Sequence, residues 1–301
     1  MVPVRRATVQ TTSYAISGVH SSRTDDPLWS SCKALLGIAS DVSSDPSSQP
    51  GPEPVRERLD PNIPALVHAG WMARFPWLVQ GTTTRGSGST EFDLGLFSDA
   101  SPGPRVHDHW EQLLARTKMA CSVHARQIHE ADVALHRALE GGLTIARPCD
   151  GHVTDEPGVL LAVATADCVP IFAVSPNPRA VSVLHAGWRG SAAGVLERGL
   201  DVLGDELGAS RSDLHLHLGP AICGRCYEVG SEVFAALGQP FPGAPAPIDL
   251  RRILAQRAVA AGVPPAHLTV STHCTQCTDS GLFSHRGGDA ARQVGYVGIR
   301  A

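Results

Sequence analysis

The sequence predicts an α/β domain built on a mixed sheet and preceded by a disordered N-terminal tail. Residues 158–165 form a continuous apolar run, as expected of a strand that is buried on both faces. Residues 191–207 place apolar side chains at helical spacing. Because such strands and helices alternate irregularly along the chain, a layered domain with a mixed sheet is the expected class.

The first 61 residues differ in composition from the rest of the chain. Residues 41–54 are nearly all Ser, Pro, Asp and Gly. Such a segment cannot bury enough apolar surface to offset the entropy lost on ordering. We therefore assign residues 1–61 to a disordered Ser/Pro-rich tail and residues 62–301 to one folded domain.

From residue 77 onward the chain alternates between strand and helix patterns. A strand pattern at 77–84 runs into a Gly-rich loop. The alternating apolar and polar residues at 214–218 predict a half-exposed strand. The other expected elements are strands at 158–165, 169–174, 180–184 and 268–272, and helices at 106–118, 191–207 and 248–261.

Composition and charge exclude several classes of function. The formal net charge is −4, so nucleic acid is a poor candidate partner. No apolar run reaches the ~18 residues that a membrane span needs, and the N-terminus lacks the apolar core of a secretory signal. We expect a cytoplasmic protein without a membrane partner. In such a compartment the 8 cysteines are expected to be reduced thiols or metal ligands.

Three residues at the ends of expected strands are candidate metal ligands. Cys168 lies between two buried strands, His185 follows a third strand, and His129 lies in a Gln-Ile-His segment. Ligand sites in α/β sheets gather where strands end. Two imidazoles and one thiolate suit Zn²⁺ and would leave a fourth position open, as in a catalytic site. The alternative is a buried cysteine with two hydrogen-bonded histidines.

Four sequence blocks, taken in order, resemble the laccase-domain family, long labelled multicopper polyphenol oxidases. The similarity spans roughly residues 65–301. The block His-Ala-Gly-Trp-Arg-Gly is the most specific of the four. The blocks are residues 166–170, 184–190, 219–222 with 226–230, and 274–275 followed by 283–286.

This resemblance implies a laccase-domain fold and purine nucleoside phosphorylase activity, in some members with adenosine deaminase or methylthioadenosine phosphorylase activity. It implies zinc, with copper less favoured, bound by His129, Cys168 and His185, which would also be catalytic. The implied partners are a purine nucleoside and phosphate. The oligomeric state is expected to be a monomer or a homodimer.

Four further residues are candidates for the same site. Arg189 lies near the start of an expected helix, where a guanidinium is well placed for phosphate, although an ordinary surface ion pair is the alternative. Arg85, beside flexible glycines, and Arg286 match arginines of the family and are expected to contact phosphate or ribose. Asp167 is a candidate to orient a metal-bound imidazole or to act as an acid or base, or else simply to cap a turn.

The chain also departs from the family pattern. Gly287 stands where a second arginine usually follows Arg286, and a His-Trp pair at 109–110 replaces an Asn-Arg pair. A Gly-Arg pair near the end appears as Ala-Arg at 291–292. These changes remove cationic side chains that could have faced a phosphate, so they bear on substrate choice more than on the metal site.

Three rival functions fit parts of the sequence. Copper-dependent phenol oxidation would need several coppers, which three scattered ligands do not supply. A cysteine hydrolase that edits cell-wall precursors would use Cys168 activated by His185. A non-catalytic protein would hold a nucleotide without turnover.

Two Cys-x-x-C pairs form a second candidate metal group. Cys223 and Cys226 are separated by 47 residues from Cys274 and Cys277. A structural zinc site with four cysteines usually has a shorter separation of ~15–20 residues. The spacing therefore favours four reduced thiols, with a second zinc as the alternative.

Overall fold

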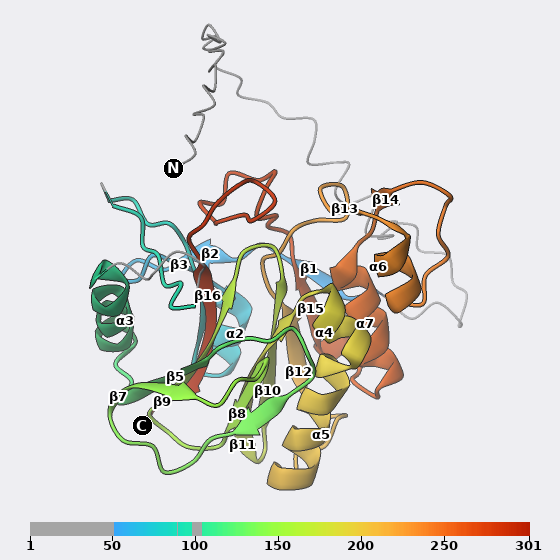
Figure 1. Ribbon diagram of the computed structural model, residues 1–301. Helices are drawn as coiled ribbons and strands as arrows, with labels where there is room; N and C mark the ends of the chain where they lie inside the picture. The colour runs from blue at the N-terminus through green and yellow to red at the C-terminus, as the bar shows by residue number, and fades with distance from the viewer. Residues whose placement is uncertain (1–50, 89, 98–103) are drawn as a thin grey trace, which may run out of the picture. The chain divides into compact units, whose positions relative to one another are not determined.

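The structure is a computed structural model that describes residues 51–88, 90–97 and 104–301 (Figure 1). Residues 1–50, the greater part of the predicted tail, lie outside the described residues. No helix in the described ranges is both long enough and apolar enough to cross a membrane.

Two seven-stranded mixed sheets form the centre of the domain. The first sheet has the order β1-β15-β12-β10-β11-β8-β6, and the second has the order β2-β3-β4-β16-β9-β5-β7. A short pair, β13 (Glu228–Val229) and β14 (Ala246–Pro247), stands apart. The strands of the first sheet are β1 Glu53–Val55, β6 Val133–Leu135, β8 Gly151–Thr154, β10 Val169–Pro176, β11 Arg179–Ala186, β12 His215–Leu218 and β15 Leu268–Ser271. Those of the second are β2 Arg58–Leu59, β3 Ala65–Val67, β4 Leu78–Thr83, β5 Cys121–Ala125, β7 Gly142–Ala146, β9 Val159–Thr165 and β16 Gln293–Ile299.

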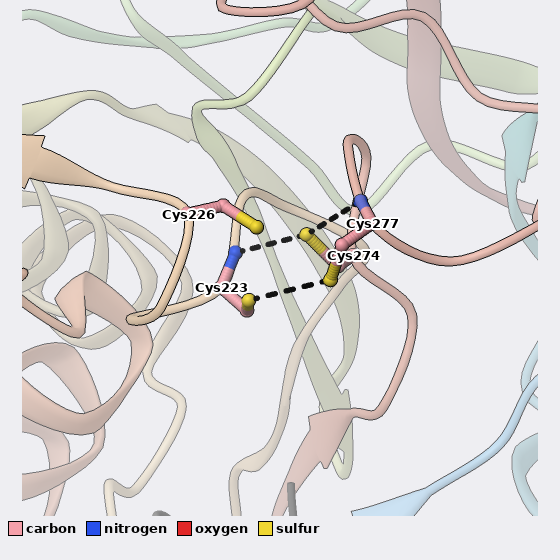
Figure 2. A group of neighbouring side chains, drawn as sticks. All are labelled: Cys223, Cys226, Cys274 and Cys277. Atoms are coloured by element: carbon pink, nitrogen blue, oxygen red, sulfur yellow. Dashed lines mark hydrogen bonds between the residues drawn. The ribbon is translucent and has the colours of Figure 1, made fainter. Parts of the chain in front are cut away.

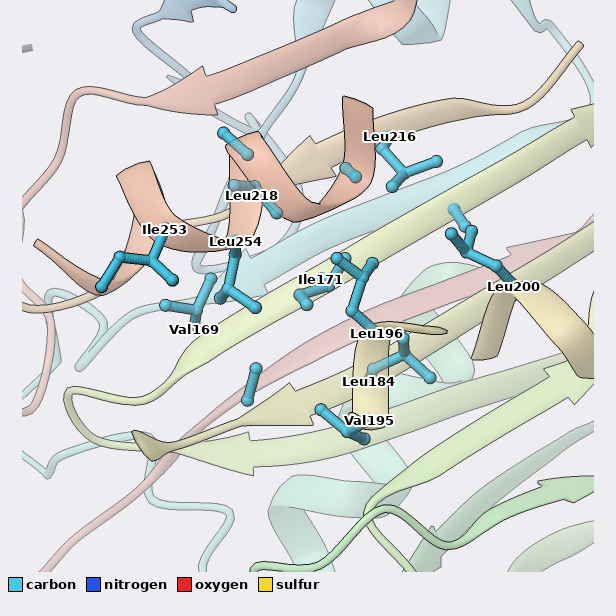
Figure 3. Packing of buried hydrophobic residues seen from close by; sticks show 14 of the residues in the cluster. Val169, Ile171, Leu184, Val195, Leu196, Leu200, Leu216, Leu218, Ile253 and Leu254 are labelled. Atoms are coloured by element: carbon cyan, nitrogen blue, oxygen red, sulfur yellow. The ribbon is translucent and has the colours of Figure 1, made fainter. Parts of the chain in front are cut away.

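Helices cover the outer face of each sheet, which makes four layers. Helix α3 (Pro104–Thr117) buries Trp110 and Leu113 against the second sheet. Helices α5 (Val195–Leu207) and α7 (Leu250–Ala260) lie on the opposite side of the molecule, over the first sheet (Figure 1). Figure 3 shows Leu196 of α5 beside Ile171 of the first sheet, and Leu200 belongs to the same hydrophobic core.

A third core lies between the two sheets. It contains Phe172 and Val183 from the first sheet and Leu161 and Val297 from the second, all fully buried. Strand β9 is buried over nearly its whole length because the inter-sheet core covers one face and the α3 layer covers the other. This double burial explains its continuous apolar sequence.

The remaining helices are short. They are α2 (Ala69–Arg74), α4 (Trp188–Ala193), α6 (Ser231–Ala236) and a 3₁₀ turn at Pro265–His267. The single helix predicted at 191–207 is interrupted at Gly194, which has a φ of 92° and ends α4 before α5 begins. A left-handed residue cannot continue a right-handed helix, and glycine adopts that conformation without steric cost.

The predicted α/β class and its buried strands are confirmed, with one error in exposure. Strand β12 was predicted to be half exposed from its His-Leu-His alternation, but all four residues are buried. His217 is fully buried and stacks on Phe172 with 6.1 Å between ring centroids. The polar face of β12 therefore points into the protein interior rather than into solvent.

The predicted tail boundary at residue 61 needs correction, because β1 and β2 lie before it. Strand β1 pairs in parallel with β15, and Glu57 is only 4% exposed. The Glu57 carboxylate accepts hydrogen bonds from His217 Nε2 and Ser271 Oγ, each at 2.9 Å. This segment is ordered by backbone pairing and by a buried carboxylate whose hydrogen bonds are all made within the protein. It has few apolar side chains, so its amino-acid composition alone predicted disorder.

Candidate metal centre and cleft

Three elements bring the predicted ligands together. Strands β10 and β11 are antiparallel and pair Pro170 with His185, so the start of β10, just after Cys168, lies beside the end of β11. The loop after β5 adds His129 from the other sheet. The ligand atoms of His129, Cys168 and His185 all lie within 4.8 Å of one another. The structure thus brings together the three residues that the sequence analysis selected as metal ligands.

Asp150, which the sequence analysis did not select, holds two of these residues in place. Its fully buried carboxylate accepts hydrogen bonds from the backbone N–H groups of Ile128 (3.1 Å), His129 (3.0 Å) and Glu130 (2.9 Å). It also accepts one from His185 Nδ1 at 2.8 Å. His129 has a φ of 60°, a left-handed conformation that is uncommon outside glycine, and these contacts hold the backbone there.

The hydrogen bond to Asp150 also decides which nitrogen of His185 can bind a ligand. Burial would raise the pKa of Asp150, but the hydrogen bond from His185 and those from the backbone lower it, so the carboxylate is ionised. An ionised carboxylate accepts a hydrogen bond from Nδ1–H, so Nε2 is the nitrogen that would bind a metal ion, in place of its own proton.

Cys168 forms a coupled pair with the histidines. Burial raises the pKa of its thiol, but the charge of His185 and hydrogen bonds with both histidines lower it to about 6. Burial lowers the pKa of His185, whereas the Cys168 thiolate and Asp150 raise it to about 9. The site therefore favours the thiolate, which is the form that binds metals or acts as a nucleophile.

Gly187 lets the chain pass close to this centre. A Cβ atom at this position would lie 2.9 Å from Cys168 Sγ and 3.4 Å from a ring carbon of His129. Gly187 is also the N-cap of α4, the helix that follows the His185 strand. Any larger residue here would displace the thiolate or the imidazole.

A cleft of about 350 Å³ opens beside the three ligands. His129, Cys168 and His185 all line it. Its other lining residues are Gly95, Phe97, His124, Ala125, Arg126, Gln127, Ala164, Thr165, Ala166, His285 and Arg292. The cleft thus combines an aromatic ring and small side chains with two guanidinium groups.

The two cleft arginines were not selected from the sequence. Arg126 is exposed and forms no ion pair with any residue that the structure describes. Arg292 is half-buried, and its Nη1 donates only to the backbone carbonyls of residues 289–291. Arg126 lies three residues before His129 on the same loop, which is the one sequence signal that could have indicated it.

The three predicted phosphate-binding arginines do not line the cleft. Arg85 forms ion pairs with Glu91 (2.6 Å) and Asp289, so its charge is already compensated. The Arg286 guanidinium donates to the Glu228 carbonyl at 3.0 and 3.1 Å. Arg189 is exposed, with its guanidinium 4.2 Å from the centre of the Trp188 ring.

Asp167 lies beside Cys168 with its carboxylate already occupied. One oxygen accepts from the Thr275 hydroxyl, and the other accepts from the Arg286 backbone N–H at 2.7 Å. Its own carbonyl accepts from Ile222 N at 3.0 Å, and its φ is 89°. Each oxygen of the Asp167 carboxylate therefore already accepts one hydrogen bond from the protein.

The fold and the site together define a class: a four-layer α/β protein with a His–Cys–His cluster that lines a cleft. A sequence profile of the family described as multi-copper polyphenol oxidoreductase laccase matches residues 79–300. The chain belongs to this family, as its sequence blocks predicted.

Relatives in the family carry names of nucleoside-cleaving or nucleoside-modifying enzymes. Purine nucleoside phosphorylase YlmD of Geobacillus stearothermophilus is 31% identical over 263 residues, which cover 77% of this chain and 95% of the relative. A purine nucleoside phosphorylase of Deinococcus radiodurans is 32% identical over 232 residues, covering 72% and 87%. Adenosine deaminase RL5, from an unknown prokaryotic organism, is 37% identical over 149 residues, covering 46% and 56%.

Solved structures agree with the fold. The crystal structure of YlmD from Geobacillus stearothermophilus aligns with a TM-score of 0.75 at 29% identity, over 81% of this chain and 99% of that chain. The chain therefore belongs to a family of enzymes and has the same fold as YlmD.

Proposed function

We propose that this protein is a zinc-containing purine nucleoside phosphorylase. It would cleave adenosine- and inosine-type nucleosides with phosphate to give the free base and ribose 1-phosphate. The observation that supports this most directly is the convergence of His129, Cys168 and His185 at a cleft that is also lined by two arginines, neither of which forms an ion pair with any described residue. Two relatives that match most of the chain bear the name of this activity.

The residues of the centre fit a zinc ion. His129, Cys168 and His185 would hold it, since a thiolate and two neutral imidazoles are ligands that zinc prefers. Asp150 keeps the His185 ring in the tautomer that frees Nε2. With three protein ligands a bound zinc could take one further ligand, and it would supply a Lewis acid at the cleft.

Arg126 and Arg292 are suited to hold the phosphate. Neither guanidinium forms an ion pair with a carboxylate among the described residues, so an incoming dianion would not have to displace an existing partner. Guanidinium groups match phosphate oxygens with two parallel hydrogen bonds. His285 lines the same cleft and adds a further hydrogen-bonding group.

Phe97 is suited to hold the purine. Its ring lines the cleft, is 45% exposed, and lies 5.6 Å from the His124 ring at a 32° tilt. A base can stack on the open face of this phenyl group.

Phosphorolysis then needs a phosphate oxygen to bond to ribose C1′ while the C1′–N bond breaks. The bonding electrons leave with the purine, which takes up a proton.

A second activity, adenosine deamination, is favoured by the similarity to adenosine deaminase RL5. In that reaction the oxygen of a water molecule bonds to the ring carbon that carries the amino group, and the amino group leaves as ammonia, without phosphate. The two activities therefore give different products from the same nucleoside.

The test is to purify the full chain, measure bound metal, and follow adenosine, inosine and methylthioadenosine by chromatography with and without phosphate. Phosphate-dependent formation of free base with an equal amount of ribose 1-phosphate is the expected result. Formation of inosine from adenosine without phosphate would assign the deaminase activity instead. If no purine nucleoside releases its base despite full metal loading, the phosphorylase proposal is wrong.

Two variants sharpen this test. Cys168→Ala should lose both the metal of the His–Cys–His centre and turnover. Cys121→Ala removes another buried thiol that is remote in sequence and absent from the cleft lining, so it should keep both. Arg126→Ala should raise the KM for phosphate more than the KM for the nucleoside. A Cys168→Ala enzyme with full activity would remove that thiol from the mechanism.

A further inference from the structure

A second cluster of metal-ligating side chains lies outside the cleft. The Sγ atoms of Cys223, Cys226, Cys274 and Cys277 all lie within 4.8 Å of one another. Figure 2 shows the four side chains from two loops turned toward a common centre. Neither the cleft nor the proposed reaction uses these cysteines. The two pairs are separated by 47 residues, and this long separation favoured four reduced thiols in the sequence analysis. The fold nevertheless brings the two pairs together.

The sulfur geometry fits a tetrahedral metal site. Zinc binds thiolates at about 2.3 Å, which places the sulfurs of a tetrahedral site ~3.8 Å apart. The Sγ atoms of Cys223 and Cys277 are 3.7 Å apart. A disulfide would need ~2.05 Å between the same atoms, and the described cysteines are all free.

Backbone hydrogen bonds from both loops converge on one sulfur. Cys274 Sγ accepts from the backbone N–H groups of Cys223 (3.2 Å), Gln276 (3.4 Å) and Cys277 (3.5 Å). Cys274 is 1% exposed, so these donors hold a sulfur that is shielded from solvent. Hydrogen bonds of this kind orient the ligands of a metal ion.

Access and rigidity also suit a bound ion. Cys223 and Cys274 are buried, Cys226 is half-buried and Cys277 is exposed, so one side of the cluster is open for metal entry. The first pair closes a tight turn through a hydrogen bond from Cys226 N to Cys223 O at 3.0 Å. We propose that these four cysteines bind a structural zinc ion that joins the 223–226 loop to the 274–277 loop.

The two loops contact the residue that precedes Cys168. Ile222, next to Cys223, donates its N–H to the Asp167 carbonyl at 3.0 Å. Thr275, next to Cys274, donates its hydroxyl to the Asp167 carboxylate. A zinc ion between the loops would fix both donors, and through them the left-handed Asp167 backbone that sets the position of Cys168. The second zinc ion would therefore be structural, and it would help to position Cys168 through Asp167.

The first experiment counts metal in a chain that lacks the other centre. Cys168→Ala protein, loaded with zinc under reducing conditions, should keep one tightly bound zinc per chain by elemental analysis. Adding Cys226→Ser and Cys277→Ser together should remove that zinc. Adding Cys121→Ser, a matched control at a buried thiol outside the cluster, should leave it. Because activity is not read, failure of the proposed phosphorylase function would not change these results.

A second experiment keeps all four cysteines of the cluster and does not depend on the folding of variants that lack them. A thiol-modifying reagent should release zinc to a chromophoric chelator in step with modification of these cysteines. Cobalt substituted into the Cys168→Ala protein should show the intense sulfur-to-metal charge-transfer bands of a four-thiolate site. Peptide mapping that finds four separately reactive thiols, a Cys223–Cys277 disulfide, or iron in place of zinc would overturn the proposal.

Discussion

A substitution at Asp150 tests which hydrogen bonds keep His129 and His185 in position. Oδ1 accepts hydrogen bonds from His129 N and His185 Nδ1, and Oδ2 accepts from Ile128 N and Glu130 N. The substitution Asp150→Asn keeps the size of the side chain but replaces one oxygen by an amide nitrogen that cannot accept. Whichever way the amide turns, two of the four donors face another donor.

The expected cost follows from the number of hydrogen bonds lost. A hydrogen bond to a charged group contributes about 1.5–3 kcal/mol, so two of them contribute roughly 3–6 kcal/mol to the free energy of unfolding. For a domain of this size, each kcal/mol lowers the melting temperature by about 2–4 °C, giving a fall of roughly 6–24 °C. Loss of the partner that orients a metal ligand should also weaken metal binding by about 10–100-fold.

The measurements are thermal unfolding with and without added zinc, and zinc affinity by competition with a chelator of known strength. Asp132→Asn is the matched control, because Asp132 forms an exposed ion pair with Arg147 and should change stability by less than ~1 kcal/mol. If Asp150→Asn unfolds at the wild-type temperature and binds zinc with wild-type affinity, Asp150 does not position the site.

Further predictions concern close packing, a buried carboxylate and the base-binding ring. Gly187→Ala should lower kcat by on the order of 10²-fold by displacing Cys168. Gly204→Ala on α5, where a Cβ would meet only the Ala209 carbonyl oxygen at an ordinary contact distance of 3.6 Å, should leave kcat unchanged. Glu57→Gln should cost on the order of 3 kcal/mol of stability at neutral pH. Burial raises the pKa of Glu57, but His217 lowers it below 4.5. The contribution of Glu57 to stability is therefore lost as the pH falls below 4.5, and the free energies of urea unfolding of the two proteins should converge. A difference between them that does not depend on pH would contradict the assignment. Phe97→Ala should raise the KM for the nucleoside by roughly 5- to 150-fold through loss of ~1–3 kcal/mol of stacking, with the KM for phosphate unchanged. Equal rises in both KM values would argue against stacking.

Most of the fold could be predicted because its strands are buried on both faces. A continuous apolar run such as 158–165 has few other structural interpretations. The errors arise where long-range partners decide the environment. Glu57 is held by hydrogen bonds from His217 and Ser271, which lie 160 and 214 residues away. No local sequence pattern predicts such distant partners. The alternation of β12 was read correctly as a strand, but its second face is covered by the protein interior.

The candidate site divides in the same way. Cys168 and His185 could be found because each lies at the end of a buried strand, and the family blocks supported them. Asp150 could not be found, since a single aspartate after Cys149 has no distinguishing pattern and its role depends on three backbone amides from a distant loop. The predicted arginines Arg85, Arg189 and Arg286 do not line the cleft, because the position of a long side chain in the sequence does not determine which cavity its guanidinium faces. Their role in phosphate binding stays a prediction.

Strand β16 has a consequence for how the chain acquires its structure. It lies between β4 and β9 in the second sheet, and pairs with both in antiparallel register. Until residues 293–299 have left the ribosome, that sheet consists of two halves with unpaired inner edges. Exposed strand edges are prone to intermolecular pairing, so the nascent chain is most vulnerable to aggregation just before this last strand inserts.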